Sequence, residues 1–137
     1  MRVLVDTNIM LDALLEREPF VRDARPLLEA IDSGQIQGYV AATTITNIFY
    51  IVRRQTRSIE RARESVSQTL AAMQICSVNS DILEVAFASN LRDFEDAVQL
   101  ACAIAENLDA IITRNPQDFA GAALPILSAS ELIESLS

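Results

Sequence analysis

The sequence predicts an α/β fold, a three-layer α/β/α sandwich in which a parallel sheet of about five strands is covered by helices on both faces. Short apolar runs alternate with longer amphipathic segments along the chain, and this alternation is typical of strands joined by helical crossovers. Half of the 137 residues are hydrophobic, so a core can form without disulfides or a structural metal ion. The chain has only three Gly and four Pro residues. We therefore expect residues 1–137 to form a single domain.

Periodicity places the individual elements. Apolar runs of four or five residues bounded by polar turns predict strands, and apolar residues at helical spacing over longer segments predict helices. The expected elements in chain order are a strand over 2–5, helices over 9–15 and 22–33, a strand over 38–42, a helix to about 55, a helix over 58–73, a strand over 75–78, helices over 81–89 and 94–107, strands over 110–113 and 124–127, and a terminal helix.

Polar residues mark where these elements begin and end. Glu18-Pro19 breaks the first helix, and Gly34 fits the end of the second. Hydroxyl, amide and carboxylate side chains cap helices by accepting hydrogen bonds from exposed backbone N–H groups. The expected caps are Thr43 or Thr44, Ser58, Asp93, and Ser128 or Ser130.

The residue types that are missing narrow the chemistry. The chain contains no His, which excludes imidazole bases, catalytic triads and HExxH metal sites. It also contains no Lys, because all eleven basic residues are Arg. This excludes Walker-A phosphate loops and Schiff-base chemistry. Carboxylates, amides, hydroxyls and guanidinium groups remain.

Charge and cysteine content indicate a cytoplasmic protein. Val3 to Val5 is too short and too quickly followed by Asp6 to be a signal segment. Cys76 and Cys102 stand far apart in apolar sequence, which predicts buried free thiols in a reducing compartment. The net charge of −8 argues against a broad nucleic-acid-binding surface but allows a local Arg patch or a metal-mediated contact.

Acidic side chains fall at one predicted edge of the sheet. Asp6 follows the first strand, Asn115 and Asp118 follow the fourth, and Asp93 and Asp96 lie at the start of the helix that leads into the fourth strand. Ligands of open parallel sheets bind beyond the carboxyl ends of the strands. Converging carboxylates repel one another, and hard cations such as Mg²⁺ or Mn²⁺ relieve the repulsion. The pattern predicts a metal site suited to phosphate chemistry.

Each of these acids also fits a structural role. Asp6 could form an Asx turn or cap the following helix. Asp93 and Asp96 are spaced like a capping box and would favour a helix N-terminus. Asp118 fits a turn. Their shared edge of the sheet favours the functional interpretation.

The motifs resemble those of the PIN domain family, which includes the VapC toxins of toxin–antitoxin pairs. The resemblance rests on VLVDTNIMLD, AATTITNIFYIVR, DFEDAVQLACAIAENLDAIITRNPQDF and ILSASELI, which together span nearly the whole chain. It implies a sheet of order 3-2-1-4-5 and metal-dependent ribonuclease activity. An antitoxin protein would be a partner if the chain is the toxin of such a pair.

The resemblance also assigns roles to residues by position. It implies that Asp6 and Asp96 are the main ligands of Mg²⁺ or Mn²⁺, with Asp93 and Asp118 as supporting acids. Thr7, Asn8 and Thr113 would shape the site. Two positions depart from the family pattern, because Asn47 and Asn115 stand where acids are common. We therefore expect at most four carboxylates near the metal, and the alternative function is an RNA- or protein-binding module with weakened catalysis.

Arginines and apolar residues suggest how the chain meets its partners. Arg53, Arg54 and Arg57 belong to a basic cluster that fits either a solvated helix end or a contact strip for the RNA backbone. The run from Ile48 to Val52 covers more than one face of a helix. A homodimer through this helix is therefore expected, unless neighbouring helices of the same chain cover the run.

Overall fold

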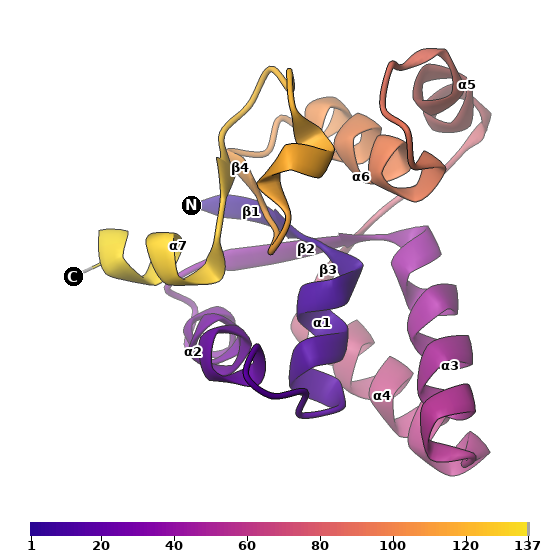
Figure 1. The fold of residues 1–137 in the computed structure, drawn as a ribbon, viewed down its shortest axis with the longest axis vertical. Coiled ribbons are helices and arrows are strands. Elements are labelled where there is room, and N and C mark those ends of the chain that lie inside the picture. The colour runs from indigo at the N-terminus through magenta and orange to yellow at the C-terminus, as the bar shows by residue number, and fades with distance from the viewer. Residues whose placement is uncertain (137) are drawn as a thin grey trace.

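Five parallel strands form the centre of the molecule in the order β3-β2-β1-β4-β5 (Figure 1). The computed structural model describes residues 1–136, so Ser137 of the predicted domain lies outside the described residues. The strands are β1 (Arg2–Val5), β2 (Gln37–Ala41), β3 (Gln74–Cys76), β4 (Ala110–Ile112) and β5 (Ile126–Leu127). The predicted three-layer fold and strand order are confirmed.

Seven α-helices and one short 3₁₀ helix join the strands within residues 1–136. They are α1 (Thr7–Leu14), α2 (Val21–Asp32), α3 (Ala42–Thr56), α4 (Ile59–Ala72), α5 (Ser80–Ala88), α6 (Phe94–Ala105), η1 (Pro116–Phe119) and α7 (Ala129–Ser135). The predicted elements differ from these by a few residues at their ends, where helices fray and strands lose pairing. None of the helices in this part of the chain is long and apolar enough to cross a membrane.

Most of the predicted caps are present, but one is wrong. The side chains of Ser58, Asp93 and Ser128 accept hydrogen bonds from the first turns of α4, α6 and α7. Helix α3 begins at Ala42 without a side-chain cap. Neither Thr43 nor Thr44, the two expected candidates, caps it, and Thr44 is fully buried with its hydroxyl 2.8 Å from that of Thr7.

The central strand divides the core into two layers. Val3 and Val5 of β1 belong to one apolar cluster, and Leu4 belongs to the other, because successive side chains of a strand point to opposite faces. Helices α1 to α4 and α7 cover the first face, and α5 and α6 cover the second (Figure 1). Both cysteines are buried and free, as predicted.

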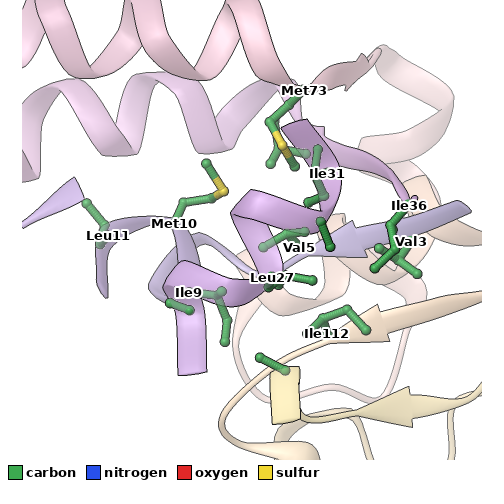
Figure 2. Packing of buried hydrophobic residues seen from close by; sticks show 14 of the residues in the cluster. Val3, Val5, Ile9, Met10, Leu11, Leu27, Ile31, Ile36, Met73 and Ile112 are labelled. Atoms are coloured by element: carbon green, nitrogen blue, oxygen red, sulfur yellow. The ribbon is translucent and has the colours of Figure 1, made fainter. Parts of the chain in front are cut away.

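A close contact in the larger cluster explains a glycine in β2. A Cβ atom at Gly38 would lie 2.6 Å from Ile31 Cδ1 and 2.7 Å from Met73 Cε, far inside van der Waals contact. Figure 2 shows Ile31 and Met73 meeting over this part of the sheet. Gly38 therefore lets α2 and the end of α4 pack directly on β2.

The apolar run in α3 is mostly covered by the chain itself. Ile48 and Val52 are fully buried, and Phe49 and Ile51 pack against the same cluster. Tyr50 alone in the run points outward, with 62% of its surface exposed. The expected apolar dimer face on this helix therefore reduces to one aromatic residue.

Candidate active site

The pairing of β1 with β4 brings Asp6 and Thr113 together. Val5 lies opposite Ile112 in the parallel ladder, so the next residue of each strand emerges at the same carboxyl edge. The Thr113 hydroxyl donates to Asp6 Oδ2 at 2.8 Å, and Gln99 Nε2 of α6 donates to Asp6 Oδ1 at 3.1 Å. Asp6 is only 4% exposed. Its carboxylate is therefore held in one orientation, and it makes no capping bond to α1.

A second set of polar contacts surrounds Thr7. Its N–H donates to Gln99 Oε1 at 3.2 Å, and its hydroxyl donates to Glu95 Oε1 at 2.8 Å. The Thr44 hydroxyl lies 2.8 Å from the same Thr7 oxygen. Asn47 of α3 donates its side-chain N–H to Glu95 Oε2. Helices α1, α3 and α6 therefore meet at Glu95, which brings a carboxylate to the position beside Asn47.

The remaining acids surround Asp96, one turn before Gln99 on α6. The pKa of Asp96 is raised to about 7, mainly by burial and then by the charges of Asp93, Asp6, Asp118 and Glu95 in that order. Asp93, Asp96 and Asp118 line a cleft of about 480 Å³. Glu95 adds a fifth carboxylate to the four acids that were expected in this region.

Several predicted site residues also have structural contacts. The side chain of Asp93 accepts from the N–H of Asp96 at 3.0 Å and caps α6. The N–H of Asn115 donates to the Thr113 hydroxyl at 3.1 Å, and its carbonyl accepts from the N–H of Asp118 at 3.0 Å. Asn8 is exposed at the start of α1. The turn after β4 is thereby fixed to the residue that orients Asp6.

The donor set fits a hard divalent cation. All five acids offer oxygen ligands, and burial together with the charges of the neighbouring acids raises the pKa of Asp96. No three acidic or thiol side chains of residues 1–136 form a ready-made metal-binding group. Mg²⁺ nevertheless binds commonly through one or two carboxylates and keeps several waters. Asp6 and Asp96 can supply those two carboxylates.

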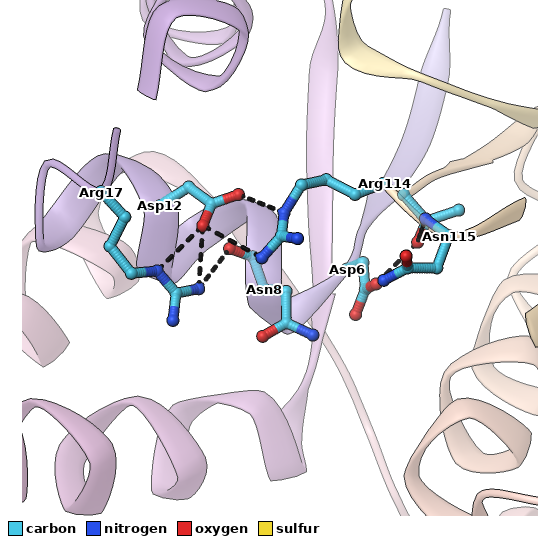
Figure 3. A network of polar contacts seen from close by, with 7 residues as sticks. Asp6, Asn8, Asp12, Arg17, Arg114 and Asn115 are labelled. Carbon is cyan, nitrogen blue, oxygen red and sulfur yellow. Dashed lines mark hydrogen bonds and ion pairs between the residues drawn. The ribbon is translucent and has the colours of Figure 1, made fainter. Parts of the chain in front are cut away.

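A different carboxylate, Asp12 of α1, is neutralised by arginines. Arg17 Nε donates to Asp12 Oδ1 at 2.9 Å, and Arg114 Nε donates to Oδ2 at 2.7 Å. Figure 3 shows Asp12 between these two guanidinium groups, with Asn8 and Asp6 nearby. Asp12 is fully buried. These ion pairs tie α1 to the turn after β4.

The predicted RNA-binding arginines lie outside the acid cleft. Arg53, Arg54 and Arg57 are exposed at the far end of α3 (Figure 1). At a rise of ~1.5 Å per residue, Arg53 and Arg57 lie about 9 and 15 Å beyond Asn47 along the helix axis. They can contact RNA only at some distance from the acids.

Four residues around the site were not predicted from the sequence: Asp12, Glu95, Gln99 and Arg114. Two carried a usable signal, because Asp12 and Gln99 are single polar residues within otherwise apolar helical runs. A buried polar side chain at such a position needs a partner. Glu95 is one of several acids in the first turn of α6, so its contacts could not be separated from a simple preference for the helix N-terminus.

Comparisons with solved structures support the fold. A toxin–antitoxin complex from Klebsiella pneumoniae contains a chain that is 26% identical, with a TM-score of 0.67 over 93% of this chain and 97% of that one. VapC20 of Mycobacterium tuberculosis, a sarcin–ricin loop cleaving toxin, is 14% identical, with a TM-score of 0.70 over 88% and 96% of the two chains. VapBC2 of Rickettsia felis, bound to a DNA fragment from their promoter, is 16% identical, with a TM-score of 0.67 over 93% and 98%.

The family assignment rests on the sequence itself. No curated protein matches the chain significantly. The family model described as PIN domain matches residues 2–117, which include Asp6, Asp93 and Asp96 together with the strands that position them. The chain therefore belongs to the PIN domain family.

Proposed function

We propose that this protein is a metal-dependent ribonuclease that hydrolyses phosphodiester bonds in RNA, with Mg²⁺ or Mn²⁺ held by Asp6 and Asp96. The observation that carries the proposal is the gathering of four acids around the partly buried Asp96, whose pKa is raised to about 7 by burial and by these charges. Membership of a family of nucleases supports it. When bound, such an ion supplies Lewis-acid activation of the phosphate and of an attacking water.

The protein side chains would have separate tasks. Asp6 is fixed by Gln99 and Thr113, which suits a ligand whose position must not change. Asp96, whose pKa is raised by burial and by the neighbouring acids, would be stabilised in its charged form by a bound cation. Asp93 and Asp118 line the same cleft and would hold a water or a further hydrated ligand. Thr7, Asn47 and Asn115 would orient the surrounding groups, and Asn8 is exposed next to Thr7 in the chain.

A nuclease assay tests the proposal directly. Purified protein should cut single-stranded RNA with Mg²⁺ or Mn²⁺, and EDTA should stop the reaction. Asp6→Asn and Asp96→Asn should each lower the rate at least about 100-fold, equivalent to about 2.7 kcal/mol of transition-state stabilisation. Glu84→Gln, an exposed change in α5, should cut like the wild type.

The binding module is the second candidate, and one observation favours it. The acids of residues 1–136 are not preassembled around a metal position. If the wild-type protein binds RNA but cuts none with either metal, the chain is a binding module. If metal-dependent cleavage survives both Asp substitutions, the ligand assignment is wrong.

We further propose that the chain is the toxin of a toxin–antitoxin pair, acts in the cytoplasm and forms a homodimer. Relatives in solved structures are toxin–antitoxin complexes, which supports an antitoxin partner.

Tyr50 of α3 and Val85 and Phe87 of α5 are exposed apolar residues, and large exposed apolar groups are typical of interfaces. In a dimer, Arg53, Arg54 and Arg57 would flank the RNA path. Light scattering that gives a monomer mass at tens of micromolar would contradict the dimer.

A further inference from the structure

The ion-pair cluster beside the acid cleft carries one positive charge in excess. Asp12 supplies one negative charge, whereas Arg17 and Arg114 both donate to its carboxylate. In a protein of net charge −8, a surplus cation next to acidic groups is a local exception. It provides a place where an anionic ligand is attracted rather than repelled.

Arg114 is held so that part of its guanidinium stays available. Nε and Nη2 donate to Asp12, at 2.7 and 3.3 Å, while Nη1 has no acceptor within residues 1–136. The side chain is 26% exposed. A guanidinium fixed by a buried carboxylate loses little further freedom when it binds a phosphate.

Phe20 completes the arrangement. The Arg114 guanidinium carbon lies 3.8 Å from the centre of the Phe20 ring, and Phe20 is 40% exposed. Exposure of an aromatic ring to water is unfavourable. The Phe20 ring is packed against the Arg114 guanidinium instead of being covered by the core. An aromatic ring next to an arginine is the combination that single-stranded RNA-binding proteins use for base stacking and phosphate contact.

These two side chains line a hollow that adjoins the acids. The hollow has a volume of about 230 Å³, and Phe20, Arg114 and Thr113 line it together with the carboxylate of Asp23 and three further residues. Thr113 also donates a hydrogen bond to Asp6, so the hollow is connected to one acid of the site through a single residue. The volume is below the ~300 Å³ that is typical of pockets for whole small molecules, and it suits one flat group.

We propose that this hollow is a subsite for one nucleotide of the RNA strand that flanks the bond at the acid cleft. Arg114 contacts the phosphate of that nucleotide through Nη1, and the exposed part of Phe20 packs against its base. The subsite rests on the proposed ribonuclease function, because it needs RNA as the ligand. It also explains how a chain of strongly negative net charge holds a polyanion at an acidic site.

Equilibrium binding separates the subsite from the chemistry. The probe is a fluorescently labelled single-stranded oligoribonucleotide, and anisotropy is measured in Mg²⁺ with the Asp96→Asn protein to keep the RNA uncut. Adding Phe20→Leu should weaken binding about fivefold or more through lost stacking. Adding Arg114→Gln should weaken it about tenfold and reduce the slope of log affinity against log salt by about 0.7, as expected for one lost phosphate contact to a single strand.

Matched variants exclude general effects. Leu70→Ala removes an apolar side chain that is 53% exposed on α4 and should bind like the parent. Arg114→Lys keeps the charge and should restore the salt slope. Thermal melting should show that Phe20→Leu is folded.

The outcomes also separate the two proposals. If the parent binds RNA and both Phe20→Leu and Arg114→Gln bind equally well, the subsite is overturned and the proposed function stands. If neither the parent nor the wild type binds or cuts RNA, the proposed function and the subsite are both overturned.

Discussion

The carboxylate of Asp12 is fully buried and that of Asp96 is partly buried. The charged neighbours of Asp12 are arginines, whereas those that act on Asp96 are acids. Asp12 is fully buried and lies within 2.9 Å of donor nitrogens from Arg17 and Arg114. Asp96 is half-buried, and the groups that act on its pKa are acids. The charge of Asp12 is neutralised by arginines of the same chain. The charge of Asp96 is disfavoured by its surroundings, so a proton or a cation from solution would stabilise this carboxyl group.

The difference distinguishes a structural acid from a functional one. A buried ion pair joins two elements, and removing one partner leaves an uncompensated charge. A group of acids without a cation stores repulsion that a ligand can relieve, and perturbed pKa values of this kind cluster at functional sites. We therefore propose that Asp96 and the four acids near it form a binding site, and that Asp12 belongs to the framework that supports it.

Replacing Asp12 tests the framework role and should have the largest effect on stability. Asp12→Asn leaves Arg17 and Arg114 without their counter-charge at a fully buried position. We expect a loss of about 3 kcal/mol or more in the free energy of unfolding, measured by urea denaturation, and a fall in melting temperature of roughly 10 °C.

Glu18→Gln is the matched control because it removes one partner of a surface ion pair. Glu18 and Arg22 lie 3.1 Å apart, with side chains 64% and 78% exposed, and such pairs contribute about 0–1 kcal/mol. Equal losses for the two substitutions would contradict the idea that burial makes the Asp12 cluster structurally important.

The comparison also shows what could be predicted from the sequence. Asp6 could be predicted because it directly follows a strand, and Asp96 because it lies in the first turn of a helix. Both positions can be located from the hydrophobic pattern of the neighbouring residues. Asp93 was correctly expected as both a cap and a neighbour of the acids. Strand order came from the family resemblance, since periodicity alone cannot tell which strands are neighbours.

The contacts between distant segments could not be predicted in the same way. Arg114 meets Asp12 across 102 residues of sequence, and Gln99 meets Asp6 across 93. Helical periodicity indicates that a residue faces inward but not what it meets there. Thr44 is a further example. Its position in the sequence suits a helix cap, but in the folded chain its hydroxyl contacts that of Thr7.

Replacing Asp96 tests the binding-site role, and its effect on stability should be smaller and of opposite sign. A carboxyl whose pKa is raised in the folded state contributes stability that is fully present below its ordinary pKa of 3.8 and is lost as pH rises through about 7. Without metal, the wild type should therefore lose stability relative to Asp96→Asn between pH 5 and pH 8. Because Asp96 is partly open to solvent, we expect a change on the order of 1–2 kcal/mol, measured by urea denaturation in EDTA.

Adding metal should reverse this difference at pH 8. A cation that binds only the folded wild type stabilises it by about 2.7 kcal/mol at 100 times its dissociation constant, whereas Asp96→Asn should gain much less. Glu84→Gln in the exposed part of α5 should follow the wild type at both pH values, with and without Mg²⁺. If the stability difference between the wild type and Asp96→Asn is independent of pH and of Mg²⁺, the repulsion around Asp96 is already relieved within the chain. Asp96 would then resemble Asp12, and the contrast between a framework acid and a metal-binding acid would be lost.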